Sequence, residues 1–253
     1  MIPTFQKLPE FLAKTKYQVP SDASAGPVQF GLDTEQPFFA YLKERARIGN
    51  AFNNFMAGYA KARPRWIDIY PVSERLTGCE NNAPLFVDVG GGLGHETAIF
   101  HEAHPDLPGK LIVQDQISVV QDATAATSLP STINIVAHDF FTPQPSTFAA
   151  AKVYFMRLIL HDWPDAECTK ILSHIKNAMK KGYSKLIINE TVLRDVGAPW
   201  QQTSLDWTMM SMLVSKERTE NQWRTLLATA GLKINGIWHK GTESVMEAIL
   251  MEE

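Results

Sequence analysis

The sequence predicts an α/β fold: a doubly wound, mostly parallel sheet of seven strands, preceded by an N-terminal segment of helices and linkers. Short apolar runs alternate with helical segments from Leu85 onward, which is typical of a parallel sheet covered by helices. One apolar run breaks into a glycine-rich turn, as a buried strand does when it feeds a helix. The chain has 253 residues, of which 45% are hydrophobic, enough for one such domain and an appendage. We therefore predict a boundary near residue 80, with an N-terminal segment over 1–80 and the sheet domain over 81–253.

The N-terminal segment has an irregular texture. It begins with a short amphipathic stretch, and residues 19–27 resemble a linker because they are rich in proline, serine and glycine. A helical stretch is predicted from residue 37 to about residue 62. Pro64 and Pro71 then break the chain again.

The sheet domain is predicted from the order of its elements. Apolar runs mark strand candidates at 85–89, 110–114, 133–137, 152–156, 185–189, 232–238 and 244–251. Helical segments are predicted at 95–104, 118–126, 165–179, 201–214 and 220–230. The short connection through Lys240, Gly241 and Thr242 predicts an antiparallel hairpin at the sheet edge. Ligands of such sheets bind at the carboxyl ends of the strands.

Composition excludes several classes of partner. The formal net charge is −3 and the chain contains no long basic run, so we expect no nucleic acid and no membrane as partners. Cys79 and Cys168 form neither a disulfide framework nor a metal-ligand spacing, which favours a reducing compartment and a cytoplasmic location. The sequence shows no signal-peptide core and no run of about 18 apolar residues.

The glycine-rich turn is the most informative motif. Asp88 is followed by four glycines within five positions: Gly90, Gly91, Gly92 and Gly94. Glycine lets the backbone approach a ligand closely, and a helix starting near His95 would aim free N–H groups at it. The dinucleotide fingerprint needs its third glycine three positions after the second, whereas Gly94 follows Gly92 by two. The spacing therefore argues against NAD. A tight strand–helix turn without a ligand is the competing interpretation.

The second strand ends in an acid that suits a nucleoside. Asp115 lies 21 residues after Gly94. An acid about 20 residues past a glycine turn is suited to ribose hydroxyls. A solvated carboxylate at a strand end is the alternative.

Polar and aromatic residues gather after the fourth strand, where substrates bind in such sheets. The cluster reads His161-Asp162-Trp163-Pro164-Asp165. Glu190 ends the fifth strand, and Glu217 follows a methionine-rich helical segment. A lone histidine is more often structural than catalytic, but its neighbours here favour a chemical role.

These motifs together resemble the plant and fungal small-molecule O-methyltransferases, the caffeic acid O-methyltransferase-like group of the class I family, and the fungal branch in particular. The resemblance covers essentially the whole chain. It rests on residues 52–59, the glycine motif, Gln114-Asp115, His138-Asp139-Phe140, the cluster at 161–165 and residues 216–219. It implies a Rossmann-like class I fold and the cofactor S-adenosyl-L-methionine, with S-adenosyl-L-homocysteine as product. The implied reaction methylates a hydroxyl of an aromatic or polyketide-derived molecule and requires no metal.

The resemblance also implies roles for individual residues. His161 is expected to be the general base, steered by Glu190 and Glu217. Cofactor contacts are expected from Asp88, Gly90, Gly92, Gly94, Asp115, Gln116, Asp139, Phe140 and Arg157. The expected substrate pocket comprises Phe52, Met56, Asp162, Trp163, Trp207, Met209 and Met212. Ordinary core packing is an equally good interpretation for each methionine and tryptophan of this pocket.

Members of the resembled family carry a further N-terminal helical region that forms a dimer and contributes to the partner's pocket. Since residues 1–80 show no counterpart of that region, we expect exposed apolar surface around residues 37–59 and 207–212. That surface predicts self-association or a partner subunit that replaces the region. Three functions stay open: an O-methyltransferase, a non-methylating enzyme of pericyclase or dehydratase type that binds the same cofactor, and a truncated, non-catalytic partner subunit.

Overall fold

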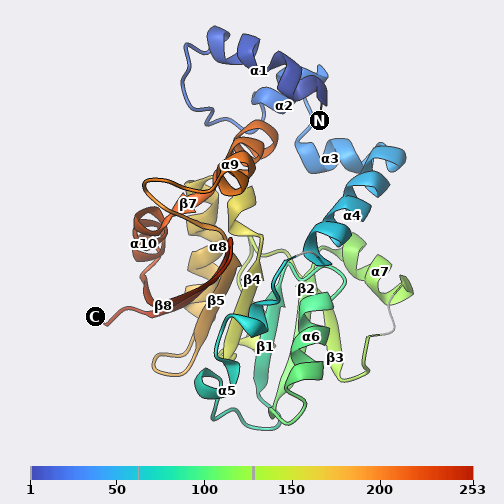
Figure 1. Cartoon of the computed structure of the whole chain (residues 1–253). Helices are drawn as coiled ribbons and strands as arrows, with labels where there is room; N and C mark the ends of the chain where they lie inside the picture. The colour runs from blue at the N-terminus through green and yellow to red at the C-terminus, as the bar shows by residue number, and fades with distance from the viewer. Residues whose placement is uncertain (1, 62, 127–128, 253) are drawn as a thin grey trace. The chain divides into compact units, whose positions relative to one another are not determined.

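The computed structural model describes residues 2–61, 63–126 and 129–252, and it contains the predicted seven-stranded sheet (Figure 1). The strand order is β3-β2-β1-β4-β5-β9-β8. Strands β1 to β5 are parallel, whereas β9 runs antiparallel to both β5 and β8, which confirms the edge hairpin. The strands are β1 (Pro84–Val89), β2 (Lys110–Asp115), β3 (Ile133–Ala137), β4 (Val153–Arg157), β5 (Lys185–Glu190), β8 (Leu232–Lys240) and β9 (Glu243–Leu250).

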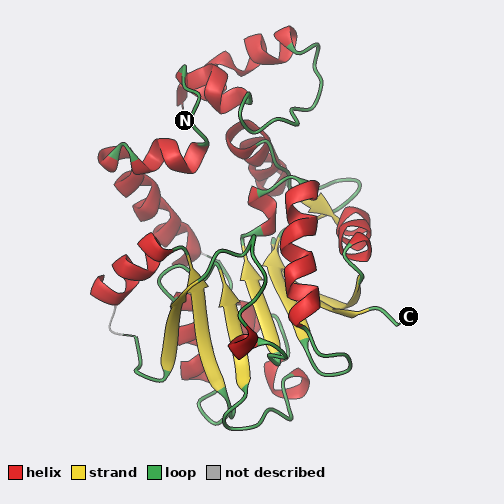
Figure 2. Ribbon diagram, turned by 180° about the vertical axis from the view of Figure 1, so that it is seen from behind, coloured by secondary structure: helices red, strands yellow, loops and turns green. Residues whose placement is uncertain are grey.

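Helices cover both faces of this sheet, as a doubly wound fold requires. Figures 1 and 2 show α6 and α8 on opposite faces. The direction of strand succession reverses between β1 and β4, and the crevice at such a reversal is where open α/β sheets bind ligands. The helices that belong to the sheet unit are α5 (Val72–Arg75), α6 (His95–Ala103), α7 (Ile117–Ala126), α8 (Asp165–Ala178) and α10 (Glu220–Thr229).

The chain divides into two compact units that are discontinuous in sequence. The N-terminal unit consists of Met1–Pro64, His161–Pro164 and Thr191–Glu220. The sheet unit consists of Arg65–Leu160, Asp165–Glu190 and Asn221–Glu253. This division differs from the single boundary near residue 80 that we predict from composition, and that boundary stays a prediction.

An aromatic cluster explains why the chain from Arg65 onward groups with the sheet. Trp66 is 0% exposed. Its ring stacks on Phe86 at 5.6 Å between centroids and lies 4.7 Å from the ring of Phe155. Phe100 of α6 completes the cluster at 5.6 Å from Trp66. Because buried aromatic side chains dominate core energetics, this contact fixes the chain after Pro64 on the sheet.

A buried carboxylate fastens the same segment to β9. Glu247 accepts hydrogen bonds from the Tyr70 hydroxyl at 2.5 Å, Arg75 Nη2 at 2.5 Å, Lys185 Nζ at 2.7 Å and Asn235 Nδ2 at 2.5 Å. Burial raises the pKa of this carboxyl, but the four donors outweigh it and lower the pKa to about 2. Glu247 is therefore ionised and ties residues 70–75 to three strands.

The N-terminal unit is helical and has a small core. Its helices are α1 (Ile2–Lys14), α2 (Pro27–Leu32), α3 (Phe38–Lys43), α4 (Ala46–Lys61) and α9 (Trp200–Leu213). The predicted helix over 37–62 is thus two helices, and residue 62 lies outside the described residues. The core cluster contains Val28, Phe38, Leu42 and Met212. A two-stranded parallel pair, β6 (Val192–Leu193) with β7 (Arg218–Thr219), was not predicted because two-residue strands leave no periodic pattern.

Within the described ranges, no helix has both the length and the apolar character that crossing a bilayer requires.

Candidate cofactor and base sites

The turn after β1 requires its glycines for two different reasons. Gly90, Gly92 and Gly94 all have positive φ, between 57° and 77°. A Cβ on Gly90 would lie 2.6 Å from Ile159 Cδ1, and one on Gly94 would lie 2.8 Å from Leu129 Cδ1. A Cβ on Gly92 would meet no atom of the described chain within 4 Å. The space at Gly92 is therefore open, while the other two glycines permit close packing.

Asp115 lies next to that open space, at the end of β2. Its Oδ2 accepts the backbone N–H of Gly92 at 2.8 Å, and its Oδ1 accepts the N–H of Gln116 at 2.7 Å. Burial raises the pKa of this carboxyl, and the two backbone bonds lower it. A carboxylate has about four acceptor sites, so two bonds leave capacity for the hydroxyls of a ligand.

Asp88 lies beneath the turn and is buried. Thr97 Oγ1 donates to Asp88 Oδ2 at 2.7 Å, and a Cβ on Gly91 would lie 2.6 Å from the carboxyl carbon. Burial raises the pKa of Asp88 to about 7, with smaller contributions from neighbouring acids. The hydrogen bond described for Asp88 thus connects the end of β1 to the first turn of α6, while its predicted contact with a cofactor stays a prediction. Thr97 was missed by sequence reasoning; its signal is its place in the first turn of α6.

The loop after β3 forms a hollow of about 560 Å³. It is lined by Gln116, Ile117, Ala137, His138, Asp139 and Phe141. Phe140 lies beside the glycine turn, with Cε1 3.6 Å from a Cβ built on Gly90. The rings of Phe140 and Phe141 are 5.1 Å apart. The structure therefore brings the predicted residues Gln116, Asp139 and Phe140 into one region of the sheet unit, and it adds two apolar residues, Ile117 and Phe141, whose only sequence signal is adjacency to them.

Arg157 at the end of β4 is held by protein partners. Its Nη1 pairs with Glu96 Oε1 at 2.7 Å, and its Nε donates to Asn189 Oδ1 at 3.1 Å. Asn189 in turn donates to the carbonyl of Ser244 at 2.9 Å. Arg157 therefore links β4, β5 and β9 to the first turn of α6, and its predicted role at a cofactor stays a prediction.

The histidine of the polar cluster forms a close contact with one of the two predicted glutamates. His161 Nδ1 lies 2.7 Å from Glu217 Oε1, although 56 positions separate the residues in sequence. His161 is 6% exposed, and Glu217 is buried. An ionised carboxylate only accepts, so we assign the ring proton to Nδ1, which leaves Nε2 as the second nitrogen. The backbone N–H of Glu217 donates to Asp206 Oδ1 at 2.9 Å, which fixes the glutamate.

Two further residues of the stretch 215–218 hold the loop that carries His161. Ser215 Oγ donates to the carbonyls of His161 and Trp163, the latter at 3.1 Å. Arg218 Nη2 donates to the carbonyl of Trp163 at 2.9 Å. Sequence reasoning assigned no role to Ser215 or Arg218, although both lie in the stretch that supplied Glu217.

The other glutamate, Glu190, bonds to backbone. Its Oε1 accepts the N–H groups of Ile159 at 3.0 Å and Leu160 at 2.6 Å. Glu190 thus fixes the end of the segment that leads into His161, and its predicted steering of the imidazole itself stays a prediction.

The residues predicted to form a substrate pocket fall into different environments of the N-terminal unit. Met212 belongs to the core cluster and Phe52 packs against that cluster, which favours the packing interpretation for both. Met209 is also buried, whereas Trp207 is 51% exposed. The remaining members, Met56, Asp162 and Trp163, are partly buried.

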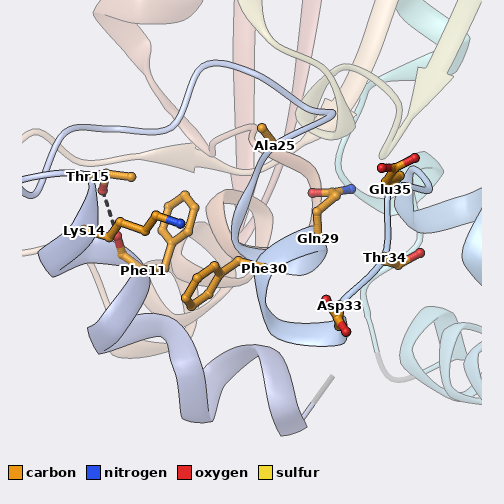
Figure 3. A pocket seen from close by; sticks show the side chains of 9 residues that line it. All are labelled: Phe11, Lys14, Thr15, Ala25, Gln29, Phe30, Asp33, Thr34 and Glu35. Atoms are coloured by element: carbon orange, nitrogen blue, oxygen red, sulfur yellow. Dashed lines mark hydrogen bonds between the residues drawn. The ribbon is translucent and has the colours of Figure 1, made fainter.

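A separate hollow of about 660 Å³ lies beside α1 and α2 (Figure 3). Its floor includes the rings of Phe11 and Phe30, 5.7 Å apart, with Lys14 Nζ 5.3 Å from the centroid of Phe30. None of the predicted site residues lines it. Among the residues with described positions, no cluster of three or more histidine, cysteine, aspartate or glutamate side chains is arranged to hold a metal ion.

The chain is similar to several known proteins. The chain is 37% identical over 250 residues to the protein named O-methyltransferase mfmE of Annulohypoxylon moriforme, covering 98% of this chain and 61% of that protein. Two solved structures, "A Pericyclic Reaction enzyme" and "The structure of LepI complex with SAM", each superpose with a TM-score of 0.89 at 36% identity. Each match covers 98% of this chain and 64% of the solved chain. The chain thus spans about three fifths of the length of the curated relatives it matches.

A family model described as an O-methyltransferase domain matches residues 75–233, which contain the glycine turn, Asp115, His161 and Glu217. The chain therefore belongs to the O-methyltransferase domain family.

Proposed function

We propose that the chain is the catalytic part of an S-adenosyl-L-methionine-dependent O-methyltransferase that methylates a hydroxyl of an aromatic or polyketide-derived small molecule. The observation that carries this proposal is the 2.7 Å contact between His161 Nδ1 and the buried Glu217. A histidine oriented by a buried carboxylate is the arrangement expected of a general base. The identity of 37% to a protein named as an O-methyltransferase supports the same reaction class.

The residues of the sheet unit fit the proposed cofactor. The open space at Gly92 gives a ligand room against the backbone, and Asp115 beside it is suited to ribose hydroxyls. The hollow lined by Gln116, Asp139 and Phe141 offers polar and aromatic surfaces to an adenine ring. S-adenosyl-L-methionine, when bound, supplies an electrophilic methyl group on a positively charged sulfur, and S-adenosyl-L-homocysteine is the product. A solved neighbour at 36% identity is a complex with SAM, which supports the choice.

His161 is proposed to take the proton of the substrate hydroxyl at Nε2. A phenol has a reference pKa near 10 and a free imidazole one near 6.5, so an unassisted histidine is a weak base for it. Glu217 fixes the tautomer and stabilises the imidazolium that forms. General-base assistance of this kind is worth about 10²–10⁴-fold, and orientation of the reacting groups supplies much of the remaining acceleration.

Glu190 and the partly buried side chains have supporting parts in this proposal. Glu190 holds the backbone at Ile159 and Leu160, the residues that directly precede His161. Met56 and Trp163 are proposed to line the apolar wall for an aromatic substrate, together with Trp207 and Met209.

The proposal is tested by incubating the protein with candidate phenols and S-adenosyl-L-methionine that carries an isotope-labelled methyl group. Mass spectrometry should find one labelled methyl gained by a hydroxyl of the product. A matched reaction with the His161→Gln variant should lose most of this gain. Transfer to carbon or nitrogen, or the absence of transfer with any hydroxylated substrate, would contradict the proposal.

A second candidate is a non-methylating enzyme that binds the same cofactor. Its specific support is the solved structure named "A Pericyclic Reaction enzyme", with a TM-score of 0.89 and 36% identity. The same labelled experiment separates the two reactions. A methyltransferase consumes the labelled cofactor in proportion to product, whereas a pericyclase or dehydratase converts its substrate and leaves the label in place.

We also propose that the N-terminal unit self-associates or binds a partner subunit. Among the described residues, Phe55 is 58% exposed and Trp207 is 51% exposed, and Phe38, Ile48 and Phe52 help to line a hollow of about 390 Å³. Light scattering of the isolated chain tests this, since a monomer at micromolar concentration would contradict self-association. The cytoplasmic location stays a prediction.

A further inference from the structure

The imidazole of His161 lies between two carboxylates. Its Nδ1 is 2.7 Å from Glu217 Oε1, and its Nε2 is 3.4 Å from Asp162 Oδ1. The side chain of His161 is 7% exposed and that of Asp162 is 22% exposed. Asp162 therefore faces the nitrogen that a base would use.

The two contacts of the imidazole constrain where its protons lie. Glu217 accepts the hydrogen bond from Nδ1–H, so the Nε2 of a neutral ring presents a lone pair. An ionised Asp162 also presents lone pairs, and two acceptors facing each other away from bulk water repel. One proton between Nε2 and Oδ1 removes the conflict, either as imidazolium beside carboxylate or as imidazole beside carboxylic acid.

We propose that Asp162 is a positioning residue that keeps one proton at His161 Nε2 in the resting protein and thereby sets the pH at which the base becomes free. This inference rests on the proposed role of His161 as the base. It assigns Asp162 a task beyond lining the substrate pocket. Before a hydroxyl substrate can give its proton to Nε2, the resting proton must leave that nitrogen, to the Asp162 carboxylate or to solvent, and the hydroxyl must take the place of the carboxyl.

The surroundings of the pair are consistent with a shared proton. Burial raises the pKa of Asp162 to about 6, the charge of His161 lowers it, and the charge of Glu217 raises it. Other charged groups lie behind Glu217 and the loop. Asp206 accepts the N–H of Glu217, and the charge of Lys216 lowers the pKa of Asp206. Arg218 donates to the carbonyl of Trp163 and so holds the loop that carries both members of the pair.

The decisive variant is Asp162→Asn, which removes the negative charge and retains the size of the side chain. An opposite charge within about 4–6 Å shifts the pKa of a group by about one to three units in favour of its charged form. Loss of the Asp162 charge should therefore move the deprotonation of His161 to lower pH by at least about one unit. Nitrogen-15 NMR of the ring measures this titration in the full chain, with the His161 signal assigned by its loss in His161→Gln. His239, which lies 2.8 Å from Ser244 in the sheet unit, provides an internal control whose titration should not move.

The pH dependence of turnover provides a second readout. The acid limb of the profile should move to lower pH in Asp162→Asn by the same amount as the NMR midpoint, and Asp162→Glu, which keeps the charge, should restore it in part. A merely structural role would lower turnover at all pH values and leave the limb in place. Asp162→Ser is the second neutral variant, in case the asparagine variant folds poorly.

The outcomes separate this inference from the proposed reaction. If His161 titrates in the neutral variants as it does in the wild type, the assignment of Asp162 is wrong, whether or not the protein methylates. If the midpoint moves but no substrate gains a methyl group, Asp162 retains its assigned role and the proposed reaction fails.

Discussion

The glycine turn of the sheet unit and the His161 cluster of the N-terminal unit are built from contacts of different range. Within the turn, Asp88 bonds to Thr97 only nine positions later. His161 meets Glu217 across 56 positions, and Ser215 reaches the same loop across 54. The hydrogen bonds of the turn therefore span from nine positions to the 23 that separate Gly92 from Asp115, whereas the base cluster forms only when stretches of chain more than 50 positions apart fold together.

The two units also differ in what they bury. The sheet unit encloses Trp66 and Phe86 completely and holds Glu247 with four donors. In the part of the chain that the structure describes, most of the exposed large apolar side chains belong to the N-terminal unit, including Phe39, Phe55 and Trp207. The sheet unit thus contains its own core, while exposed apolar side chains are concentrated in the N-terminal unit, which is the basis of the association proposed above.

The largest expected effect is the loss of cofactor binding when the glycine turn of the sheet unit is changed. Gly92→Val places a branched side chain in the open space at the turn and in a backbone conformation, φ +57°, that valine rarely adopts. Calorimetry should detect no binding of S-adenosyl-L-methionine. Gly182→Val is the matched control, because Gly182 also has positive φ, 72°, and open space. Unchanged affinity in Gly92→Val would show that the turn does not hold the cofactor.

The His161 cluster of the N-terminal unit is tested by His161→Ala, which should lower turnover by about 10²–10⁴-fold. Cofactor affinity should stay nearly unchanged, because a base acts in the transition state. Steady-state kinetics and calorimetry on the same preparation check both statements. Wild-type turnover in this variant would favour a reaction without a base, such as the pericyclic alternative.

The core of the sheet unit is tested by Glu247→Gln, which breaks a buried, charged network and should cost about 3 kcal/mol of unfolding free energy at pH 7. The pKa of Glu247 is lowered to about 2 in the folded protein, below the unfolded value of about 4.3. Its contribution is therefore complete above about pH 4.3 and is lost as the pH falls towards 2. Denaturant unfolding at pH 7 and pH 3 should show a smaller difference at pH 3. Glu252→Gln is the control, since the Lys233–Glu252 pair is exposed and should contribute almost nothing.

The last prediction concerns the stability of the protein and Asp88, the buried carboxyl beside the glycine turn. The pKa of Asp88 is raised to about 7 in the folded protein, so folding favours the protonated carboxyl. The stability that this proton contributes is complete below about pH 3.9 and declines as the pH rises through 7. Asp88→Asn mimics the protonated form and should be more stable than wild type at pH 8, with little difference at pH 4. Equal thermal shifts at both pH values would contradict the ionisation of a buried Asp88.

Local patterns in the sequence were enough to predict the sheet and its glycine turn. The strand β3 was predicted residue for residue, and the edge hairpin was predicted from its short connection. Both signals are local, because buried parallel strands are continuous apolar runs and the turn requires glycine. The candidate residues His161, Glu217, Asp115 and Gly92 were singled out in the same way, since each lies in a motif of a few residues, and their roles stay predictions.

The tertiary structure alone shows which of those side chains contact one another. Trp66 and Tyr70 pack into the core of the sheet unit, a contact that no local pattern in residues 65–80 indicates. Sequence reasoning treated Glu190 and Glu217 as equivalent, yet the described bonds of Glu190 hold backbone while Glu217 contacts the imidazole. Asp162 was assigned only to the substrate pocket, and its position opposite Nε2 became visible once the loop was folded. Such pairings depend on the path of the chain over tens of residues, and no local pattern in the sequence encodes them.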